Sequence, residues 1–146
     1  FIDEDGNIRT IKGDDHGFGY RTSVFQNSKK VILSSKIVLK KGDKQCIRDK
    51  MNDLNERRRQ KQPLDLPSAG SVFKRPEGYY AGKLIEDCGL KGYRIGDAQV
   101  SEKHCGFIVN RGNATAKEVI QLIEHIQKTV KNKFGVDLHT EIKIMM

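Results

Sequence analysis

Apolar residues recur along the chain with two different spacings, and these spacings predict its elements. In residues 1–11, short apolar and β-favouring runs flank Asp5-Gly6-Asn7, which predicts a strand, a turn and a second strand. Residues 13–19 are rich in glycine, aspartate and histidine, and they predict a loop. Residues 31–40 alternate and contain many β-branched side chains, so they predict a further strand. The first forty residues are therefore expected to form strands and loops.

A helix is predicted from about residue 43 to residue 60, because apolar side chains recur there at helical spacing opposite a face of lysine and arginine. The apolar positions are Cys46, Ile47, Met51 and Leu54. Pro63 and Pro67 follow, and they predict an extended connection. The sequence therefore predicts two domains, 1–62 and 63–146.

The first half of the second predicted domain mixes short elements with glycine-rich turns. Small residues at 68–71 predict a turn that leads into 72–76. Apolar spacing predicts a short helix over 79–88, with Gly89 after its end. Residues 92–106 are charged and irregular, whereas 107–109 indicate a buried strand.

The clearest helix of the sequence follows. Thr115 and Glu118 form a capping box, and Gly135 ends the helix. Its apolar stripe consists of Val119, Ile120, Leu122, Ile123, Ile126, Val130 and Phe134. Residues 136–144 then predict a closing strand, which places Glu141 and Lys143 on one face. The order of elements predicts the α+β class. A parallel dinucleotide-binding fold is excluded, because no strand is followed by GxGxxG and a helix.

Charge adds one alternative to this description. The formal net charge is +8, and ten of the lysine and arginine residues lie between Lys36 and Lys61. A basic chain is compatible with nucleic acid or with anionic small molecules such as nucleotides. This stretch contains no aromatic residue for stacking on bases, so a solvated helix face is the favoured interpretation and nucleic-acid binding the weaker one.

The cysteine pattern and the hydropathy further restrict the class of protein that the sequence predicts. The three cysteines are odd in number and have no CxxC spacing, so neither a disulfide framework nor a zinc site is predicted. No apolar run approaches the ~18 residues that a membrane-spanning helix needs, so no membrane partner is predicted. The first residue is not methionine, and we expect the chain to begin inside a longer, cytoplasmic protein.

Three sets of residues could bear chemistry. Ser71 follows a glycine at a predicted turn, where its hydroxyl could donate a proton. Lys74, Arg75 and Lys91 lie among glycines and could bind a diphosphate or carboxylate. The third set joins Tyr20-Arg21 with Glu141, an arginine and a glutamate from opposite ends of the chain. From the residues alone, a plain turn serine is the favoured interpretation of Ser71, and ordinary surface residues are the favoured interpretation of the third set. For the cations, a binding site and an ordinary surface are equally favoured.

Ordered sequence blocks change this balance, because together they resemble the UDP-N-acetylenolpyruvoylglucosamine reductase family. The blocks are GYRTSVF at 19–25, SAGSVFKRP at 68–76, AGKLIE at 81–86, GLKG at 89–92, QVS at 99–101, FIVN at 107–110, GNAT at 112–115 and Glu141-Ile142. The compact spacing is similar to the shorter-loop subgroup, and the substrate-clamping tyrosine of the longer-loop subgroup is not found.

The resemblance implies a fold and a reaction. It implies the end of a flavin-binding α+β domain in 1–62 and a small α+β substrate-binding domain in 63–146. In the family, FAD accepts a hydride from NADPH and passes it to the enolpyruvyl group of a UDP-sugar, which gives UDP-N-acetylmuramate for peptidoglycan. The resemblance implies that Ser71 is the general acid, with Arg21 and Glu141 as its catalytic partners. It also places Tyr20, Lys74, Arg75, Lys91 and His104 at the substrate.

The family's glycine-rich flavin loop has no counterpart in this sequence. We therefore expect the 146 residues alone to bind FAD poorly and to be inactive. A non-redox UDP-sugar or nucleotide-binding module is the alternative function, and it would use the same cations without needing Ser71. The sequence does not give the oligomeric state.

Overall fold

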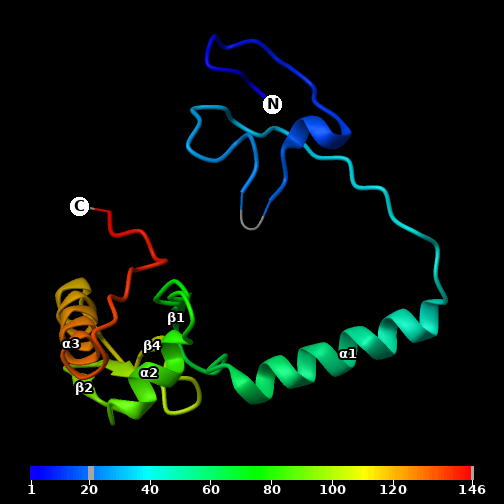
Figure 1. Ribbon diagram of the computed structural model, residues 1–146. Coiled ribbons are helices and arrows are strands. Elements are labelled where there is room, and N and C mark those ends of the chain that lie inside the picture. Colours follow the sequence, from blue (N-terminus) through cyan, green and yellow to red (C-terminus); the bar gives the residue numbers. More distant parts are fainter. Residues whose placement is uncertain (20–21, 146) are drawn as a thin grey trace. The chain divides into compact units, whose positions relative to one another are not determined.

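The computed structural model describes residues 1–19 and 22–145 (Figure 1). Close contacts divide the chain into two compact units, Phe1–Asp43 and Lys44–Met146. The sequence-predicted boundary at residue 62 lies one helix further along the chain, and the assignment of the two sides to cofactor and substrate stays a prediction.

Within its described residues, the first unit contains a turn at 3–7 and three isolated bridges, two at Ile2 and one between Gly19 and Thr22. Ile2 pairs with both Ile8 and Val31. The Asp3 carboxylate accepts hydrogen bonds from the Asp5 and Asn7 N–H groups and from Arg9 Nε, at 3.1, 2.8 and 3.0 Å. These bonds favour the ionised carboxylate, so the side-chain bond from Arg9 and then the backbone bond from Asn7 lower the pKa of Asp3.

Two expectations for this unit need correction. A 3-10 helix, η1, occupies Gly13–His16 within the predicted loop. Residues 31–40 do not form the predicted strand, because only Val31 of this segment pairs with another described segment. Side chains from Ile32 to Leu39 are consequently exposed, Val38 to 90%. No described residue of the unit is buried.

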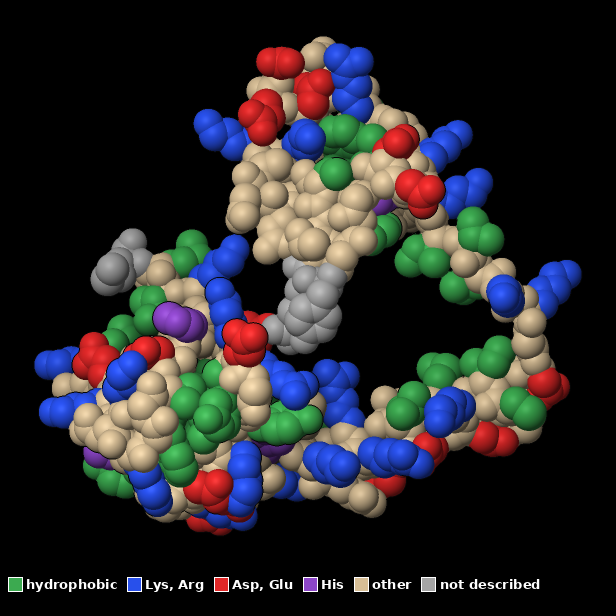
Figure 2. Space-filling view, in the orientation of Figure 1, with side chains coloured by type: hydrophobic (Ala, Val, Ile, Leu, Met, Phe, Trp, Pro, Cys, Tyr) green, Lys and Arg blue, Asp and Glu red, His purple; other side chains and the backbone are tan. Residues whose placement is uncertain are grey.

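Helix α1 spans Lys44–Lys61, which confirms the predicted helix to within a residue at either end. Its side chains form i,i+4 pairs, such as Arg57 Nε with Asp53 at 2.9 Å. None of its residues is buried, and Ile47, Met51 and Leu54 are 49%, 58% and 51% exposed. Lysine and arginine side chains lie along it together with fewer acidic ones (Figure 2).

The rest of the second unit is built on a four-stranded antiparallel sheet. Its strands are β1 (Ser68–Ser71), β2 (Arg94–Ile95), β3 (Ala98–Val100) and β4 (Phe107–Asn110), in the order β1-β4-β3-β2. Strand β4 was predicted, but 68–71 had been assigned to a turn and 92–106 to an irregular segment. Both assignments are wrong, because strands this short show no alternating pattern.

Local geometry explains these short strands. Ile95 pairs with Ala98 across Gly96 and Asp97, and Gly96 has a φ of +57°, which suits a two-residue hairpin turn. In β1, Gly70 has a φ of +85° and lies where the register with β4 shifts between Ser68 and Ser71. A glycine at a bulge tolerates this conformation because it has no Cβ.

Helices α2 (Ala81–Asp87) and α3 (Ala116–Phe134) contact each other, and α3 also contacts β2 and β3 (Figure 1). The capping box at Thr115 is present, and Gly135 ends α3 with a φ of +70°, as predicted. The apolar stripe of α3 meets the sheet in the core. The fully buried residues of this core include Ile85 of α2, Val100 of β3 and, from α3, Leu122, Ile126 and Val130.

The predicted closing strand over 136–144 is reduced to one bridge, between Phe73 and Thr140. The Lys74 N–H donates to the His139 carbonyl and the Glu141 N–H donates to the Val72 carbonyl, both at 2.8 Å. On the Lys74 side, no hydrogen bond from the described His139 N–H back to the Lys74 carbonyl extends the ladder. On the other side, the Val72 N–H is already bonded to the Gly106 carbonyl.

Candidate functional site

Ser71 stands at the end of β1, opposite Phe107 of β4. Its residue is exposed, and its hydroxyl donates a long hydrogen bond of 3.4 Å to the Phe73 carbonyl. A bond of this length is weak, so the hydroxyl can exchange it for a ligand. The strand, rather than the predicted turn, therefore presents Ser71.

His104 lies beside Ser71, with Gly106 between them. The Gly106 N–H donates to His104 Nδ1 at 3.0 Å, so in the neutral ring Nε2 bears the proton. A Cβ on Gly106 would lie 2.9 Å from His104 Cε1 and 3.7 Å from Ser71 Oγ. A Cβ on Gly82 of α2 would also meet the ring, at 3.2 Å. Two bare glycine positions thus make room for an exposed imidazole whose Nε2–H can serve a ligand.

Glu141 reaches the same region from the end of the chain. Its N–H donates to the carbonyl of Val72, the residue next to Ser71. The final segment therefore brings Glu141 alongside β1, although the two are far apart in the sequence. Ser71, His104 and Glu141 come together on three different segments of one unit.

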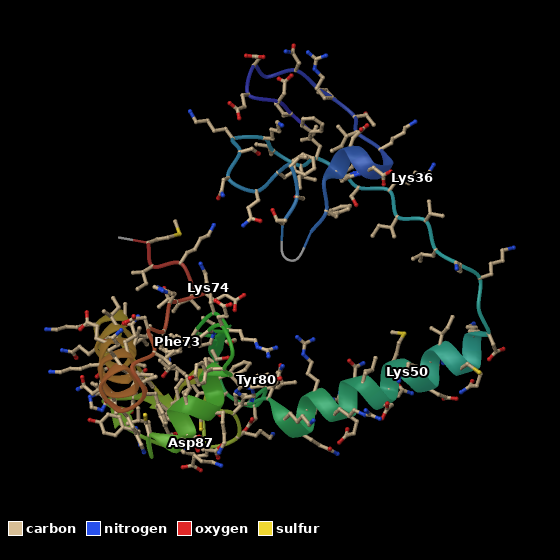
Figure 3. The ribbon with its side chains drawn as sticks, in the orientation of Figure 1. Lys36, Lys50, Phe73, Lys74, Tyr80 and Asp87 are labelled. Atoms are coloured by element: carbon tan, nitrogen blue, oxygen red, sulfur yellow. The ribbon has the colours of Figure 1, made fainter. Side chains whose placement is uncertain are left out.

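The predicted cations differ in how they are engaged. Lys74 follows Phe73 on the segment that leaves β1 (Figure 3), and its N–H belongs to the pairing with His139. Arg75 Nε donates to the Tyr79 carbonyl at 3.3 Å, and its guanidinium lies 4.0 Å from the centre of the Tyr80 ring. Both cations remain exposed and available to an anion.

Lys91 is already paired, because its Nζ lies 3.4 Å from a carboxylate oxygen of Glu86. The Lys91–Glu86 pair lies near the His104–Gly106 loop, because both charges act on the pKa of the Cys105 thiol within that loop. Burial raises the pKa of Cys105, the Glu86 charge raises it further and the Lys91 charge opposes both. An anion that recruits Lys91 must therefore compete with Glu86.

Tyr20 and Arg21 lie outside the described residues. The structure consequently does not test whether they meet Ser71, and their predicted roles stay predictions. The other six predicted site residues all belong to the second unit.

Some features of this surface were not found from the sequence. Tyr80 and Gly106 gave no signal, because a single aromatic residue or glycine has no periodicity, and Gly82 appeared only as part of a sequence block. A cavity of about 350 Å³ was also unforeseen. It is lined by Pro63, Asp65, Leu66, Gln99, Ser101, Glu102, Lys103, Val109 and Arg111.

Two further findings apply to the described residues. No group of three or more His, Cys, Asp or Glu side chains in them could hold a metal ion. None of their helices combines the length and the apolar character that crossing a membrane requires.

The fold defines a small α+β domain, in which helices α2 and α3 pack with an antiparallel sheet. Comparison with known proteins assigns it to a family, since residues 62–145 match the family described as UDP-N-acetylenolpyruvoylglucosamine reductase, C-terminal domain. The chain belongs to this family, as the ordered blocks of the sequence predicted, and the α+β class is confirmed as well.

Individual relatives agree with the family match. Reductases of this name from Caldanaerobacter subterraneus subsp. tengcongensis and Limosilactobacillus reuteri are 58% and 57% identical over 144 and 141 residues. These alignments cover 99% and 97% of the chain but only 48% and 47% of the relatives. A crystal structure of the reductase from Thermus caldophilus matches 96% of the chain and 49% of its own, with a TM-score of 0.72 and 33% identity. The chain thus spans about half the length of the relatives it matches.

Proposed function

We propose that this chain supplies the substrate-binding side of a cytoplasmic, NADPH- and FAD-dependent reductase. The reaction converts UDP-N-acetylglucosamine enolpyruvate to UDP-N-acetylmuramate, a precursor of peptidoglycan. The family match supports the proposal. The observation that bears most on it is the convergence of Ser71, His104 and Glu141 where β1 meets β4 and the final segment.

The reaction adds a hydride to one carbon of the enolpyruvyl double bond and a proton to the other. We assign the proton to the Ser71 hydroxyl, which is exposed and only weakly bonded to Phe73. A neutral serine is a weak acid, so its conjugate base needs stabilisation at the moment of transfer. The proposed role of Glu141, held beside Val72, is to orient the reacting group or relay the proton.

The substrate carboxylate accumulates charge as the hydride arrives. A fixed cation at that carboxylate lowers the barrier, because it stabilises the transition state more than the ground state. Arg21 is proposed for this role on the basis of its sequence block, with Tyr20 beside it. The UDP portion is assigned to Lys74, Arg75, Lys91 and the Nε2–H of His104. Arginine suits bidentate binding of a phosphate, and lysine acts as a point charge.

The flavin would supply the reducing equivalents that NADPH provides. The glycine-rich flavin loop of the family has no counterpart in the sequence. FAD and NADPH are therefore proposed for the protein of the relatives' length, and the chemistry argued above is that of the substrate side alone. The 146 residues by themselves are expected to be colourless and inactive.

Two measurements test the proposal. The purified 146-residue chain should show no flavin absorbance and should not oxidise NADPH in the presence of the enolpyruvyl substrate. A yellow and active preparation would contradict the assignment of this chain to the substrate side only.

The role of Ser71 is tested in a protein of the relatives' length that contains this sequence. Ser71→Ala should reduce turnover by about 10²- to 10⁴-fold, because a positioned general acid contributes that much. Binding of UDP-N-acetylglucosamine should be kept. Ser68→Ala, on the same strand, is the matched control. If Ser71→Ala leaves turnover unchanged, the acid role is wrong. If the unchanged protein and its variants all lack reductase activity, a non-redox UDP-sugar-binding module becomes the better function.

A further inference from the structure

An exposed aromatic residue stands against one of the proposed phosphate-binding cations. The Arg75 guanidinium lies 4.0 Å from the centre of the Tyr80 ring, which is 64% exposed. At the same time, Arg75 Nε donates to the carbonyl of the neighbouring Tyr79. One face and one edge of the guanidinium are therefore held by adjacent residues just before α2.

The Tyr80 side chain has no evident part in folding. Tyr80 precedes α2 as its N-cap residue, but its side chain makes no capping hydrogen bond. Its carbonyl accepts from the Lys83 and Leu84 N–H groups, and any residue could provide that carbonyl. The next residue, Ala81, is the one that enters the core. An exposed aromatic at this place is better explained by its contact with Arg75.

The Arg75 side chain is held without being neutralised. Within residues 1–19 and 22–145, no carboxylate forms an ion pair with it. Lys91, by contrast, is paired with Glu86. Cation–π contact uses the face of the guanidinium and leaves the Nη edge free, which is the edge that binds phosphate oxygens in pairs.

The Tyr80–Arg75 pair also lies close to the other proposed site residues. Arg75 is four residues beyond Ser71, and Tyr80 directly precedes the turn of α2 that contains Gly82. Gly82 borders the His104 ring, which borders Gly106 and Ser71. A series of neighbouring residues therefore connects the Arg75 guanidinium with Ser71, the proposed proton donor.

We propose that Tyr80 is a positioning residue that pre-orders Arg75 for the diphosphate of the UDP-sugar. The inference rests on the proposed function, because that function makes Arg75 a diphosphate ligand. A long arginine side chain that is already ordered loses less conformational freedom when the ligand binds. Tyr80 acts through its ring face, so phenylalanine should replace it and an aliphatic residue should not.

Binding of UDP to the folded 146-residue chain, measured by calorimetry with circular dichroism to confirm folding, provides the first test. Tyr80→Leu should weaken UDP binding by about two- to tenfold, which corresponds to the ordering of one flexible side chain. Tyr80→Phe should bind as the unchanged chain does. Tyr93→Leu is the matched control, because Tyr93 is also an exposed tyrosine but stacks on His125 at 4.5 Å. Uridine, which has no phosphate, should bind all variants equally.

A double variant separates positioning from a direct contact. Once Arg75→Ala has removed the guanidinium, adding Tyr80→Leu should weaken UDP binding no further. An additional loss would show that Tyr80 touches the ligand itself, and equal UDP binding by Tyr80→Leu and the unchanged chain would also overturn the proposal.

A measurement without ligand distinguishes the two possible failures. The Tyr80 ring current should shift the side-chain NMR resonances of Arg75, and the shift should disappear in Tyr80→Leu but persist in Tyr80→Phe. Its absence from the unchanged chain overturns the positioning role by itself. If the shift is present but the unchanged chain does not bind UDP, the proposed function fails, and the ligand assigned to the Tyr80–Arg75 pair fails with it.

Discussion

Three cysteine residues show how strongly environment separates identical side chains. Cys46 is exposed on α1, Cys88 is half-buried, and Cys105, within the His104–Gly106 loop, is buried. Burial raises the pKa of both Cys88 and Cys105, and for Cys88 the Lys133 charge opposes this shift while that of Asp87 adds to it. A raised pKa leaves less thiolate at any given pH, and the thiolate is the reactive form.

We expect a disulfide reagent at pH 8 to modify Cys46 first, Cys88 more slowly and Cys105 last. Reaction at Cys105 should accelerate as the pH rises toward its elevated pKa, and in denaturant the three rates should converge. Mass spectrometry of quenched samples gives the order. Cys105 reacting as fast as Cys46 in the native chain would contradict the buried position.

The surroundings of Gly106 support another prediction at the scale of single residues. Alanine at this position would bring a Cβ to 2.9 Å from the His104 ring, so the ring must move. Such overpacking costs about 1–3 kcal/mol. Gly106→Ala should therefore destabilise the chain and shift the His104 ring resonances in NMR spectra. In the His104→Ala background the same substitution should be much milder, and equal costs in both backgrounds would show that the ring is not the obstacle.

At the scale of elements, the long helices and the apolar strand β4 were predictable, whereas β1, β2 and β3 were not. The stripes of α1 and α3 repeat over 18 and 19 residues, and the capping box and Gly135 mark the ends of α3. Strands β1 to β4 have two to four residues each, too few for a period to show. Residues 31–40 and 136–144 had strand composition, but beyond Val31 and Thr140 no described segment pairs with them.

The candidate site was only partly predictable for the same reason. Ser71, the cations and Glu141 were named from sequence blocks, yet their meeting depends on hydrogen bonds between segments that no local pattern encodes. The bond from Glu141 to Val72 is one example, and the opening made by Gly82 and Gly106 around His104 is another.

The N-terminus of α3 offers a test at this scale. The Thr115 hydroxyl accepts from the Glu118 N–H at 3.2 Å, and the Glu118 carboxylate accepts from the Thr115 N–H at 2.7 Å. Thr115→Ala should lower the free energy of unfolding by about 1 kcal/mol, because it removes an acceptor for an unpaired helix N–H. Thr115→Ser keeps the acceptor and should have little effect. Chemical denaturation measures both, and equal losses would contradict the capping role.

At the scale of the whole molecule, burial is distributed unevenly between the two units. The described residues of Phe1–Asp43 contain no buried side chain, whereas the core of the second unit runs from Val72 to Leu138. Since apolar burial is the main favourable term in folding, the two units should differ in resistance to opening. Lys44–Lys61, which belongs to the second unit but has no buried residue, should behave like the first.

Hydrogen exchange tests this division. Amides of 72–138 should exchange slowly, and those of 1–61 should exchange quickly. Ile126 is fully buried, so Ile126→Ala should lower the stability of the core by about 2–5 kcal/mol and speed exchange there. Val38→Ala, at a 90% exposed position, is the control and should change neither part. Strong protection of 1–61 in the unchanged chain would show that burial does not set the pattern.

The pairing of the final segment with residues 72–74 has a practical consequence for protein engineering. The backbone of Glu141 is held beside Val72 by a hydrogen bond of 2.8 Å. An insertion or a label within 139–141 would act on the same short segment that places a proposed catalytic carboxylate. Fluorophores and immobilisation anchors are therefore better attached on α1, which has no buried residue, and in a protein of the relatives' length an insertion within 139–141 should weaken reductase activity.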